Sequence, residues 1–355
     1  MKEALYYEKQ ADHTIRCLLC PNFCTIAEGK SGSCRSRKNI EGTLYATNYG
    51  RTTSLNIDPI EKKPLYHYYP GSMILSLGAN SCNLHCEFCQ NYEISQSDCP
   101  TSALSPSELL EILLRKDLKQ VAFTYTEPFT WYEFIHDCAK LFQPHDIRIV
   151  LVTNGYINPE PLAELLPYLD AMNIDLKSIN ADFYKKVCQG SLQPVLSTIR
   201  TAFTDCHIEL TNLLIPDLND KESEIQALVD FVAEVNPHIP LHFSKYFPRW
   251  KCNQPATSDA TLINAYQLAK EKLSYVYLGN MQTDKYCNTS CPRCNKLLID
   301  RSLNPVRSVA FQSYNCIEAA LPFDKLRVTH CPQINKSNQN SRCSCGFEIY
   351  GRFDA

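Results

Sequence analysis

The sequence predicts an α/β fold in which repeated βα units build a parallel sheet. Short β-rich runs alternate with amphipathic helical segments over the middle of the 355-residue chain, and several runs are apolar at nearly every position. Such runs are typical of strands covered on both faces. Repeated βα units form either an open doubly wound sheet or a full or partial barrel. The length gives a prior of two or three domains.

The β-rich runs are dominated by Val, Ile, Phe and Tyr, and they lie at residues 73–79, 120–125, 147–153, 171–176, 208–214, 241–246 and 275–278. A helix is expected from Ser105, a capping residue that is followed by Pro106 and by leucines at helical spacing. Residues 221–235 and 261–272 have the same helical character. In both kinds of parallel sheet, functional groups lie beyond the C-terminal ends of the strands.

The composition argues against several classes of protein. Hydrophobic residues make up 44% and charged residues 21% of the chain, a balance typical of a globular protein with a large core. Lys+Arg 35 against Asp+Glu 38 gives a net charge of −3, so no basic excess indicates nucleic acid or an acidic membrane surface. The N-terminus has no apolar signal-peptide core, and no apolar run reaches about 18 residues. We therefore expect a cytoplasmic protein with no membrane span.

Cysteine is the unusual residue of this chain, with 19 copies. An odd number cannot be fully paired, and in a reducing cytoplasm clustered thiols are more often metal ligands or redox groups than disulfides. Most of these cysteines fall into three groups, within residues 17–34, 82–89 and 287–345. Six lie singly, at positions 99, 138, 188, 206, 252 and 316, and are expected to be small buried hydrophobes.

The central group follows the first predicted strand. Cys82, Cys86 and Cys89 have the spacing C-x3-C-x2-C, with Phe88 just before the last cysteine. Three thiolates in one short loop can hold three corners of a cubane cluster and leave the fourth iron open to the amino and carboxylate groups of a substrate or cofactor. The alternatives are three core cysteines or a zinc knuckle with His85 as a fourth ligand, although paired C-x2-C knuckles are the usual zinc signature.

This loop resembles that of the radical S-adenosylmethionine (SAM) enzymes, and the resemblance extends over about residues 70–285. Residues 124–128, Thr-Tyr-Thr-Glu-Pro, end the second strand and are similar to the family's GGEP-type motif, whose backbone binds the methionyl amino group. Tyr125 and Thr126 stand where that motif has two glycines. Asn154 ends the third strand, and Asp175 and Lys177 end the fourth, like the Asp-x-Lys of pyruvate formate-lyase activating enzymes.

The resemblance implies a set of side chains that hold the cofactor at the strand ends: Phe88, Glu127, Asn154, Asp175, Lys177 and His242. Phe88 would pack near the adenine, and Asp175 and Lys177 would engage ribose and carboxylate. Residues 213–220, after the fifth strand, would lie against the adenine. His242 lies in the sixth strand, where it either contacts the nucleoside or substrate or is a satisfied core histidine.

A closer resemblance spans nearly the whole chain. Residues 18–24, 87–92, 124–128, 172–178, 241–248 and 276–280 are similar to the AmmeMemoRadiSam-system radical SAM enzymes, relatives of the pyruvate formate-lyase activating enzymes. That resemblance implies a partial (β/α)6 barrel, open on one side for a large substrate. The domains are then expected at 1–68 (Cys-rich module), 69–285 (radical SAM core) and 286–355 (zinc-ribbon-like module with a long insertion).

The chemistry implied by this family is reductive cleavage of SAM. A reduced [4Fe–4S] cluster passes one electron to the sulfonium, and the resulting 5′-deoxyadenosyl radical abstracts hydrogen from the substrate. The partners implied are a one-electron donor such as flavodoxin or ferredoxin, and a protein, peptide, RNA or small-molecule substrate. The alternatives are a glycyl-radical-enzyme activase that acts on a partner protein and, outside enzymes, a metal-binding scaffold or nucleic-acid adaptor.

The two flanking cysteine groups have metal-ligand spacing. Four thiols in one segment suit zinc or an auxiliary iron–sulfur cluster, and the N-terminal set is Cys17, Cys20, Cys24 and Cys34. The C-terminal set resembles the two knuckles of a zinc ribbon and consists of Cys291, Cys294, Cys343 and Cys345. Its second knuckle is one residue short, which leaves Cys331 or Cys287 as replacements. Residues 303–340 are expected to form a long loop.

Overall fold

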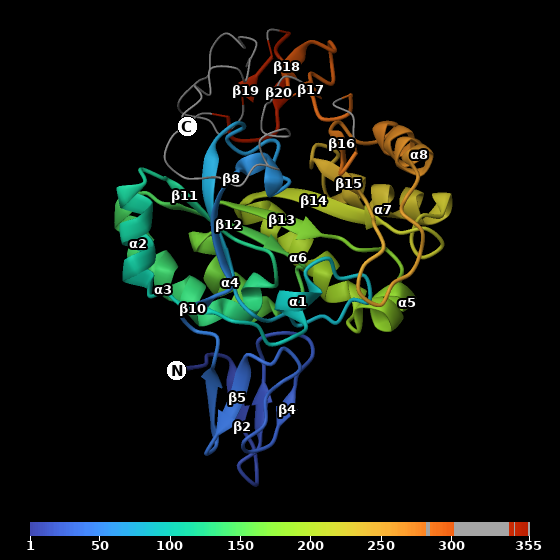
Figure 1. Cartoon of the computed structure of the whole chain (residues 1–355). Coiled ribbons are helices and arrows are strands. Elements are labelled where there is room, and N and C mark those ends of the chain that lie inside the picture. Colours follow the sequence, from blue (N-terminus) through green and yellow to red (C-terminus); the bar gives the residue numbers. More distant parts are fainter. Residues whose placement is uncertain (282–284, 302–340, 344, 354–355) are drawn as a thin grey trace.

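The fold is a curved α/β barrel with a small β-rich module at each end (Figure 1). The computed structural model describes residues 1–281, 285–301, 341–343 and 345–353. The loop predicted at 303–340, with Cys316 and Cys331, lies outside the described residues.

The central feature is an 8-stranded sheet with the order β16-β15-β14-β13-β12-β11-β9-β8. All pairs from β9 to β16 are parallel, and β8 pairs antiparallel with β9 at the edge. The strands are β8 (Ser54–Pro59), β9 (Met73–Gly78), β11 (Gln120–Phe123), β12 (Arg148–Thr153), β13 (Ala171–Asp175), β14 (His207–Leu214), β15 (Leu241–Lys245) and β16 (Val276–Gly279). The seven predicted runs therefore become β9 and β11 to β16, each within two residues at either end.

The strand order makes the sheet a barrel wall. Each parallel strand is added to the sheet beside the one before it in the chain, always at the same edge. Because parallel crossovers are right-handed, the connecting helices all lie on one face of the sheet. Because β8 and β16 are the two edges, the wall stays open. The predicted partial barrel is confirmed, with β16 as one parallel strand beyond the six that were expected.

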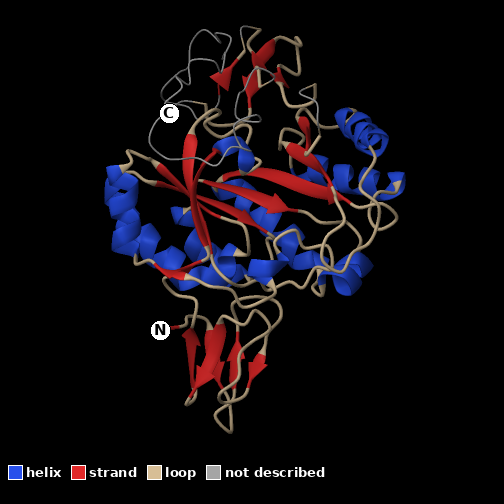
Figure 2. Cartoon of the chain, viewed as in Figure 1, coloured by secondary structure: helices blue, strands red, loops and turns tan. Residues whose placement is uncertain are grey.

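The helices run along the outer side of the curved sheet (Figure 2). They are α1 (Tyr92–Ser95), α2 (Pro106–Arg115), α3 (Tyr132–Phe142), α4 (Pro159–Leu165), α5 (Ala181–Phe183), α6 (Leu192–Asp205), α7 (Glu222–Val235) and α8 (Asp259–Lys270). Ser105 caps α2 as predicted, since its hydroxyl accepts from the Glu108 N–H while the Glu108 side chain accepts from the Ser105 N–H. No described helix is long and apolar enough to cross a membrane.

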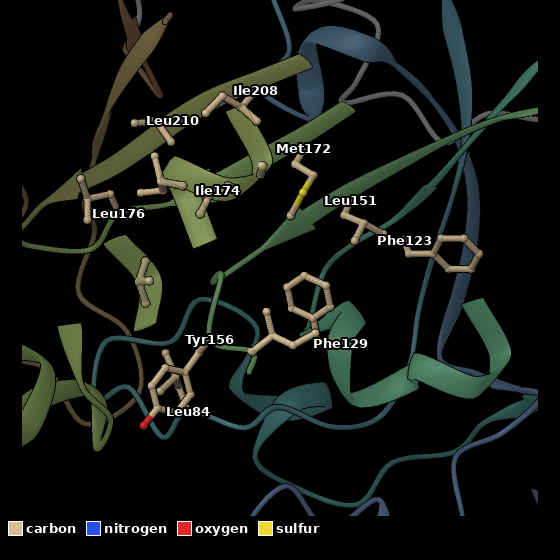
Figure 3. Close-up of a cluster of buried hydrophobic side chains, with 14 of the residues drawn as sticks. Leu84, Phe123, Phe129, Leu151, Tyr156, Met172, Ile174, Leu176, Ile208 and Leu210 are labelled. Atoms are coloured by element: carbon tan, nitrogen blue, oxygen red, sulfur yellow. The ribbon is translucent and has the colours of Figure 1, made fainter. Parts of the chain in front are cut away.

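The strands alternate between a large apolar outer face and a small or polar inner face. Phe123, Leu151 and Met172 pack in the main core beneath the helices, as Figure 3 shows. Their neighbours Ala122, Val150 and Ala171 point to the other face, where a separate apolar cluster forms. Side chains of residues 60–69 fill that cluster from inside the barrel: Ile60, Leu65, Tyr68 and Tyr69.

This internal segment, residues 60–69, fills one end of the barrel. The backbone N–H groups of Tyr66 and His67 donate to the Glu209 carboxylate of β14 at 2.9 and 2.6 Å. The Asn173 amide of β13 donates to the carbonyl of Pro64 at 2.9 Å. Residues 54–69 thus belong structurally with the barrel, although they straddle the domain boundary predicted at residue 68.

The two flanking modules lie at opposite ends of the barrel (Figure 1). The N-terminal one has the sheets β1-β6-β5 and β2-β3-β4 and lies near the C-terminal ends of the barrel strands. Its strands are β1 (Lys2–Glu3), β2 (Tyr7–Lys9), β3 (Ile15–Cys17), β4 (Thr25–Ile26), β5 (Arg37–Ile40) and β6 (Thr43–Ala46), and β7 (Arg51–Thr52) pairs with β10 (Ser102–Ala103). The C-terminal one consists of the hairpins β17 (Thr289–Ser290) with β18 (Leu297–Ile299) and β19 (Ser341–Arg342) with β20 (Glu348–Ile349).

Candidate active site

The loop that carries Cys82, Cys86 and Cys89 leaves β9 at the C-terminal edge of the sheet and is anchored at its middle. Leu84 is fully buried in the main core (Figure 3). Gly190 lies directly against it, and a Cβ there would come within 2.4 Å of Leu84 Cδ2, so Leu84 would have to shift to admit any other residue.

A π-helical turn, η5 (Tyr184–Cys188), holds the same loop from the side. The N–H groups of His85 and Glu87 donate to the carbonyls of Cys188 and Val187 at 2.9 and 3.0 Å. The loop is therefore ordered by the protein's own contacts.

The three central sulfurs are farther apart than the ligands of one ion. Within the described residues, Cys82, Cys86 and Cys89 do not all lie within 4.8 Å of one another, unlike the four C-terminal thiols. In a cluster each sulfur binds a different iron, so this wider spacing and the three-thiolate donor set fit a cubane. Burial raises the pKa of the Cys82 thiol well above its usual value, so a bound cation would be needed to hold it as a thiolate.

Cys188 is a fourth thiol at this loop, which the sequence indicated only as an isolated buried hydrophobe. It is fully buried at the end of η5. The neighbouring Cys188 thiol, together with burial, raises the pKa of the Cys86 thiol well above its usual value. No sequence spacing points to this contact, because the two residues are 102 positions apart.

Glu127 joins the ends of β11 and β12. Its Oε1 accepts from the Thr153 hydroxyl at 2.7 Å and the Phe129 N–H at 3.0 Å, and its Oε2 accepts from the Asn154 N–H at 2.8 Å. Burial raises the pKa of Glu127 to about 7, against these three hydrogen bonds, which lower it. Both carboxylate oxygens of Glu127 are therefore bound by protein groups. The groups that residues 124–128 can still offer a ligand are those of the backbone.

Tyr125 occupies a glycine position of the GGEP-type motif and adopts a glycine-like backbone. Its φ is +69°, in the left-handed region that favours glycine. The side chain is held on the far side of the loop, where its hydroxyl donates to Asp58 at 2.9 Å and Lys63 Nζ lies 4.7 Å from the ring centroid. The substitution thus keeps the backbone geometry for which glycine is usually needed.

Asn154 contacts the cysteine loop. Its Nδ2 donates to Asn83 Oδ1 at 2.9 Å and lies 3.7 Å from Cys82 Sγ, while its Oδ1 accepts from the Tyr156 N–H at 2.8 Å. The side chain is buried. The predicted contact between Asn154 and the cofactor stays a prediction, and the sequence did not indicate this link to Cys82.

Asp175 and Lys177 form an ion pair beside the cysteine loop. Lys177 Nζ lies 2.9 Å from Asp175 Oδ2 and 5.9 Å from the centroid of the Phe88 ring. Burial lowers the pKa of Lys177, but the Asp175 carboxylate and the Cys86 and Cys188 thiols outweigh it and hold that pKa well above its usual value. Asp175 is the more exposed partner, with 37% of its side chain accessible against 14% for Lys177.

His242 lies inside the barrel and has a protein partner. Its Nε2 lies 2.6 Å from Glu209 Oε2, and its ring packs edge to face on Tyr66 at a centroid distance of 4.7 Å. His207 bonds the other oxygen of Glu209 at 3.1 Å. Of the two readings that the sequence left open for His242, this geometry favours a satisfied core histidine.

The C-terminal cysteines form a compact four-thiol site. Sγ of Cys291 lies 3.6 Å from that of Cys345, and Sγ of Cys294 lies 3.5 Å from that of Cys343, with all four within 4.8 Å of one another. The short C-x-C knuckle therefore completes the site without Cys287. This is the predicted metal-binding module.

The sequence relationships agree with the geometry. Residues 77–232 match the Radical SAM superfamily. An uncharacterized protein of Methanocaldococcus jannaschii is 45% identical over 308 residues, which cover 85% of this chain and 92% of that protein. The chain belongs to the radical SAM superfamily.

Two more distant matches carry the names of activating enzymes. The 4-hydroxyphenylacetate decarboxylase activating enzyme of Clostridium scatologenes is 24% identical over 163 residues, which cover 41% of this chain and 52% of that enzyme. A solved structure, a domain of pyruvate-formate lyase-activating enzyme from Bacteroides vulgatus, is 21% identical with a TM-score of 0.41, covering 45% of this chain and 98% of that one.

Radical SAM membership implies a [4Fe–4S] cluster and SAM, and an enzyme of radical chemistry. The three thiols of the central loop fit the cluster by number, since three thiolates leave one iron open. Asp175, Lys177 and the segment at Tyr125 lie around the same strand ends, where a ligand of that cluster would bind.

Proposed function

We propose that this radical SAM protein cleaves SAM reductively on a [4Fe–4S] cluster held by Cys82, Cys86 and Cys89, and thereby removes a hydrogen atom from its substrate. The observation that carries the proposal is the three-thiol loop, which η5 and Leu84 hold at the C-terminal edge of the barrel. When bound, the cluster and SAM supply the one-electron chemistry that generates the 5′-deoxyadenosyl radical.

The chain's own residues would bind and orient the cofactor. Asp175 is the accessible carboxylate at the strand ends, so it would accept hydrogen bonds from the ribose hydroxyls. Lys177 would attract the methionyl carboxylate, and its charge would also offset the negative charge of the thiolates. Phe88, buried beside Lys177 and 5.7 Å from Phe183, would pack against the adenine. Electrons would come from a donor of the flavodoxin or ferredoxin class.

The deciding experiment is anaerobic reconstitution with iron and sulfide, followed by SAM and dithionite and an assay for 5′-deoxyadenosine. Wild-type protein should form it, and Cys82→Ala, Cys86→Ala and Cys89→Ala should not. Cys99→Ser, at a half-buried cysteine outside the three groups, is the matched control and should keep the activity. Cleavage that persists in any of the three alanine variants would refute the cluster assignment. A wild-type protein without cleavage would favour a metal-binding scaffold or nucleic-acid adaptor.

We propose that the chain belongs to the AmmeMemoRadiSam branch of the superfamily, on the motifs quoted above, and that it acts on a substrate still to be identified. A glycyl-radical-enzyme activase is the second candidate, because two of the similar proteins are named activating enzymes, including the (2S)-3-sulfopropanediol dehydratase activating enzyme of Klebsiella oxytoca. An activase should generate a glycyl-radical paramagnetic signal on a partner protein. An enzyme that modifies a peptide, an RNA or a small molecule should instead form more 5′-deoxyadenosine when that substrate is added than when it is left out.

A further inference from the structure

The four N-terminal cysteines surround one small cavity. Cys17 ends β3, Cys20 and Cys24 lie on the turn that leads to β4, and Cys34 precedes β5. All four line a cavity of about 10 Å³, which is about the space that one water molecule needs. Three of them are buried and Cys24 is half-buried. The segments that meet here are short strands and turns, so a shared ligand is a direct way to hold them together.

The spacing of these sulfurs differs from that of a zinc site. Four sulfurs at about 2.3 Å from one tetrahedral zinc lie about 3.8 Å apart and leave no room between them for a water-sized sphere. The C-terminal thiols of this chain have that spacing, with pairs at 3.5 and 3.6 Å. Within the described residues, no three of the N-terminal sulfurs lie within 4.8 Å of one another. Sulfurs that bind four different irons of a cubane are separated in this way.

A buried cation forms part of the cavity wall. Arg37 is 1% exposed, lines the cavity, and pairs with Glu133 at 2.5 Å through Nη2. Its Nη1 donates to the carbonyl of Leu5 at 2.8 Å, whereas its Nε has no hydrogen-bond partner among the described residues. An unpaired buried donor is costly. The sulfide of a cluster, or a thiolate bound to it, would accept that hydrogen bond.

The cavity also lies against the central cysteine loop. Asn83, the neighbour of Cys82, lines it, and so does Thr130. Asn22, between Cys20 and Cys24, donates its side-chain amide to the carbonyl of Asn83 at 2.7 Å. This hydrogen bond links the two cysteine loops, and a group bound in the cavity would lie next to the proposed active site.

We propose that Cys17, Cys20, Cys24 and Cys34 bind a second [4Fe–4S] cluster. Each thiol gives up its proton to solvent and its thiolate binds one iron, so that all four irons have a protein ligand. This cluster differs from the central one in having no iron free for SAM. The assignment is independent of the proposed function, because it concerns metal content at a separate set of residues.

The test separates the two sites within one chain. In a variant with Cys82, Cys86 and Cys89 all changed to Ala, anaerobic reconstitution should leave about four irons and four sulfides per chain, half of the wild-type content. After reduction, the remaining cluster should give a paramagnetic signal that SAM does not change. Adding Cys20→Ala and Cys24→Ala to that variant should remove this iron, whereas adding Cys99→Ser should not.

One zinc and no sulfide at the N-terminal site would overturn the proposal, as would no metal there. The triple alanine variant keeps all four N-terminal cysteines, so its iron and sulfide content decides the matter even if the variants at Cys20 and Cys24 fail to fold. A wild-type protein that cleaves no SAM would refute the proposed function alone, because the metal count of the triple variant would still stand.

Discussion

The side-chain amide of Asn154 lies 3.7 Å from the sulfur of Cys82, and the same amide bonds Asn83 at 2.9 Å. The end of β12 is thereby connected to the cysteine loop after β9, although β11 lies between the two strands. Asn154 thus supports a thiol that would bind the cluster.

Asn154→Ala should accelerate loss of the central cluster. A hydrogen bond contributes about 1 kcal/mol, so iron release to a chelator should be several-fold faster than in wild type. Iron release under anaerobic conditions measures this directly. The variant is also predicted from the sequence to bind SAM more weakly. Unchanged iron release with weaker SAM binding would mean that Asn154 is a cofactor contact only.

Asp175→Asn should weaken SAM binding while the cluster still assembles. A lost charged contact costs about 1–3 kcal/mol, or roughly five- to 150-fold in Kd. The change also leaves Lys177 without its partner at 2.9 Å, so thermal stability should fall. Equilibrium binding and iron content are measured on the same preparation. As a control, Asp259→Asn breaks the exposed pair with Lys245 and should leave binding unchanged. Normal SAM affinity in Asp175→Asn would exclude the predicted role.

Cys188→Ala should lower the reduction potential of the central cluster without removing iron. Once Cys86 is a thiolate, the neighbouring Cys188 thiol can donate a hydrogen bond to it, and hydrogen bonds to cluster sulfurs favour the reduced state. Losing about 1 kcal/mol corresponds to a shift on the order of tens of millivolts. A redox titration followed by paramagnetic resonance gives the potential. Loss of iron in this variant would instead make Cys188 a cluster ligand.

Glu127 should titrate near neutral pH. Burial raises its pKa to about 7 from an ordinary 4.5, so the folded chain holds this proton more tightly than the unfolded chain. The contribution of Glu127 to stability therefore falls as pH rises from about 4.5 to about 7. An infrared band of a protonated carboxyl should disappear as the pH passes through about 7, and Glu127→Gln should lack it. A band that is absent at pH 6 would mean that the three hydrogen bonds outweigh burial.

Cys291→Ser should lower zinc content and thermal stability and leave the central iron in place. The four C-terminal sulfurs have the spacing of a tetrahedral zinc site, and the module around them is too small to fold on apolar burial alone. Metal analysis and thermal unfolding measure both effects. Arg342→Ala, beside the site but not a thiol, is the control. Unchanged zinc content in Cys291→Ser would show that the metal is elsewhere.

The sequence predicted the barrel well because every parallel strand carries its own apolar run. β12 is one such run, and its bounds need no long-range information. The position of residues 60–69 inside the barrel could not be predicted in this way. Tyr66 and His67 show no periodic pattern, and they are held by Glu209, which lies more than 140 residues later in the chain. The contact of Cys188 with Cys86 likewise depends on how η5 packs.

Single side chains at the strand ends were harder to predict than the strands. Glu127 and His242 have the residue types of cofactor contacts, yet both are engaged by protein groups, Thr153 and Glu209 among them. Residue type alone cannot distinguish a side chain that is available to a ligand from one whose hydrogen-bonding groups already have protein partners. Asp175 fits the prediction better, because it is still partly exposed.

The segment at residues 60–69 closes one end of the barrel and leaves the other end accessible. Glu209 fixes Tyr66 and His67 from within, and beyond them Arg301 and Tyr350 of the C-terminal module bond the same two residues. Residues 60–69 therefore fill this end of the barrel. A ligand of the proposed active site would therefore reach it from the rim formed by the strand ends, part of which the N-terminal module covers.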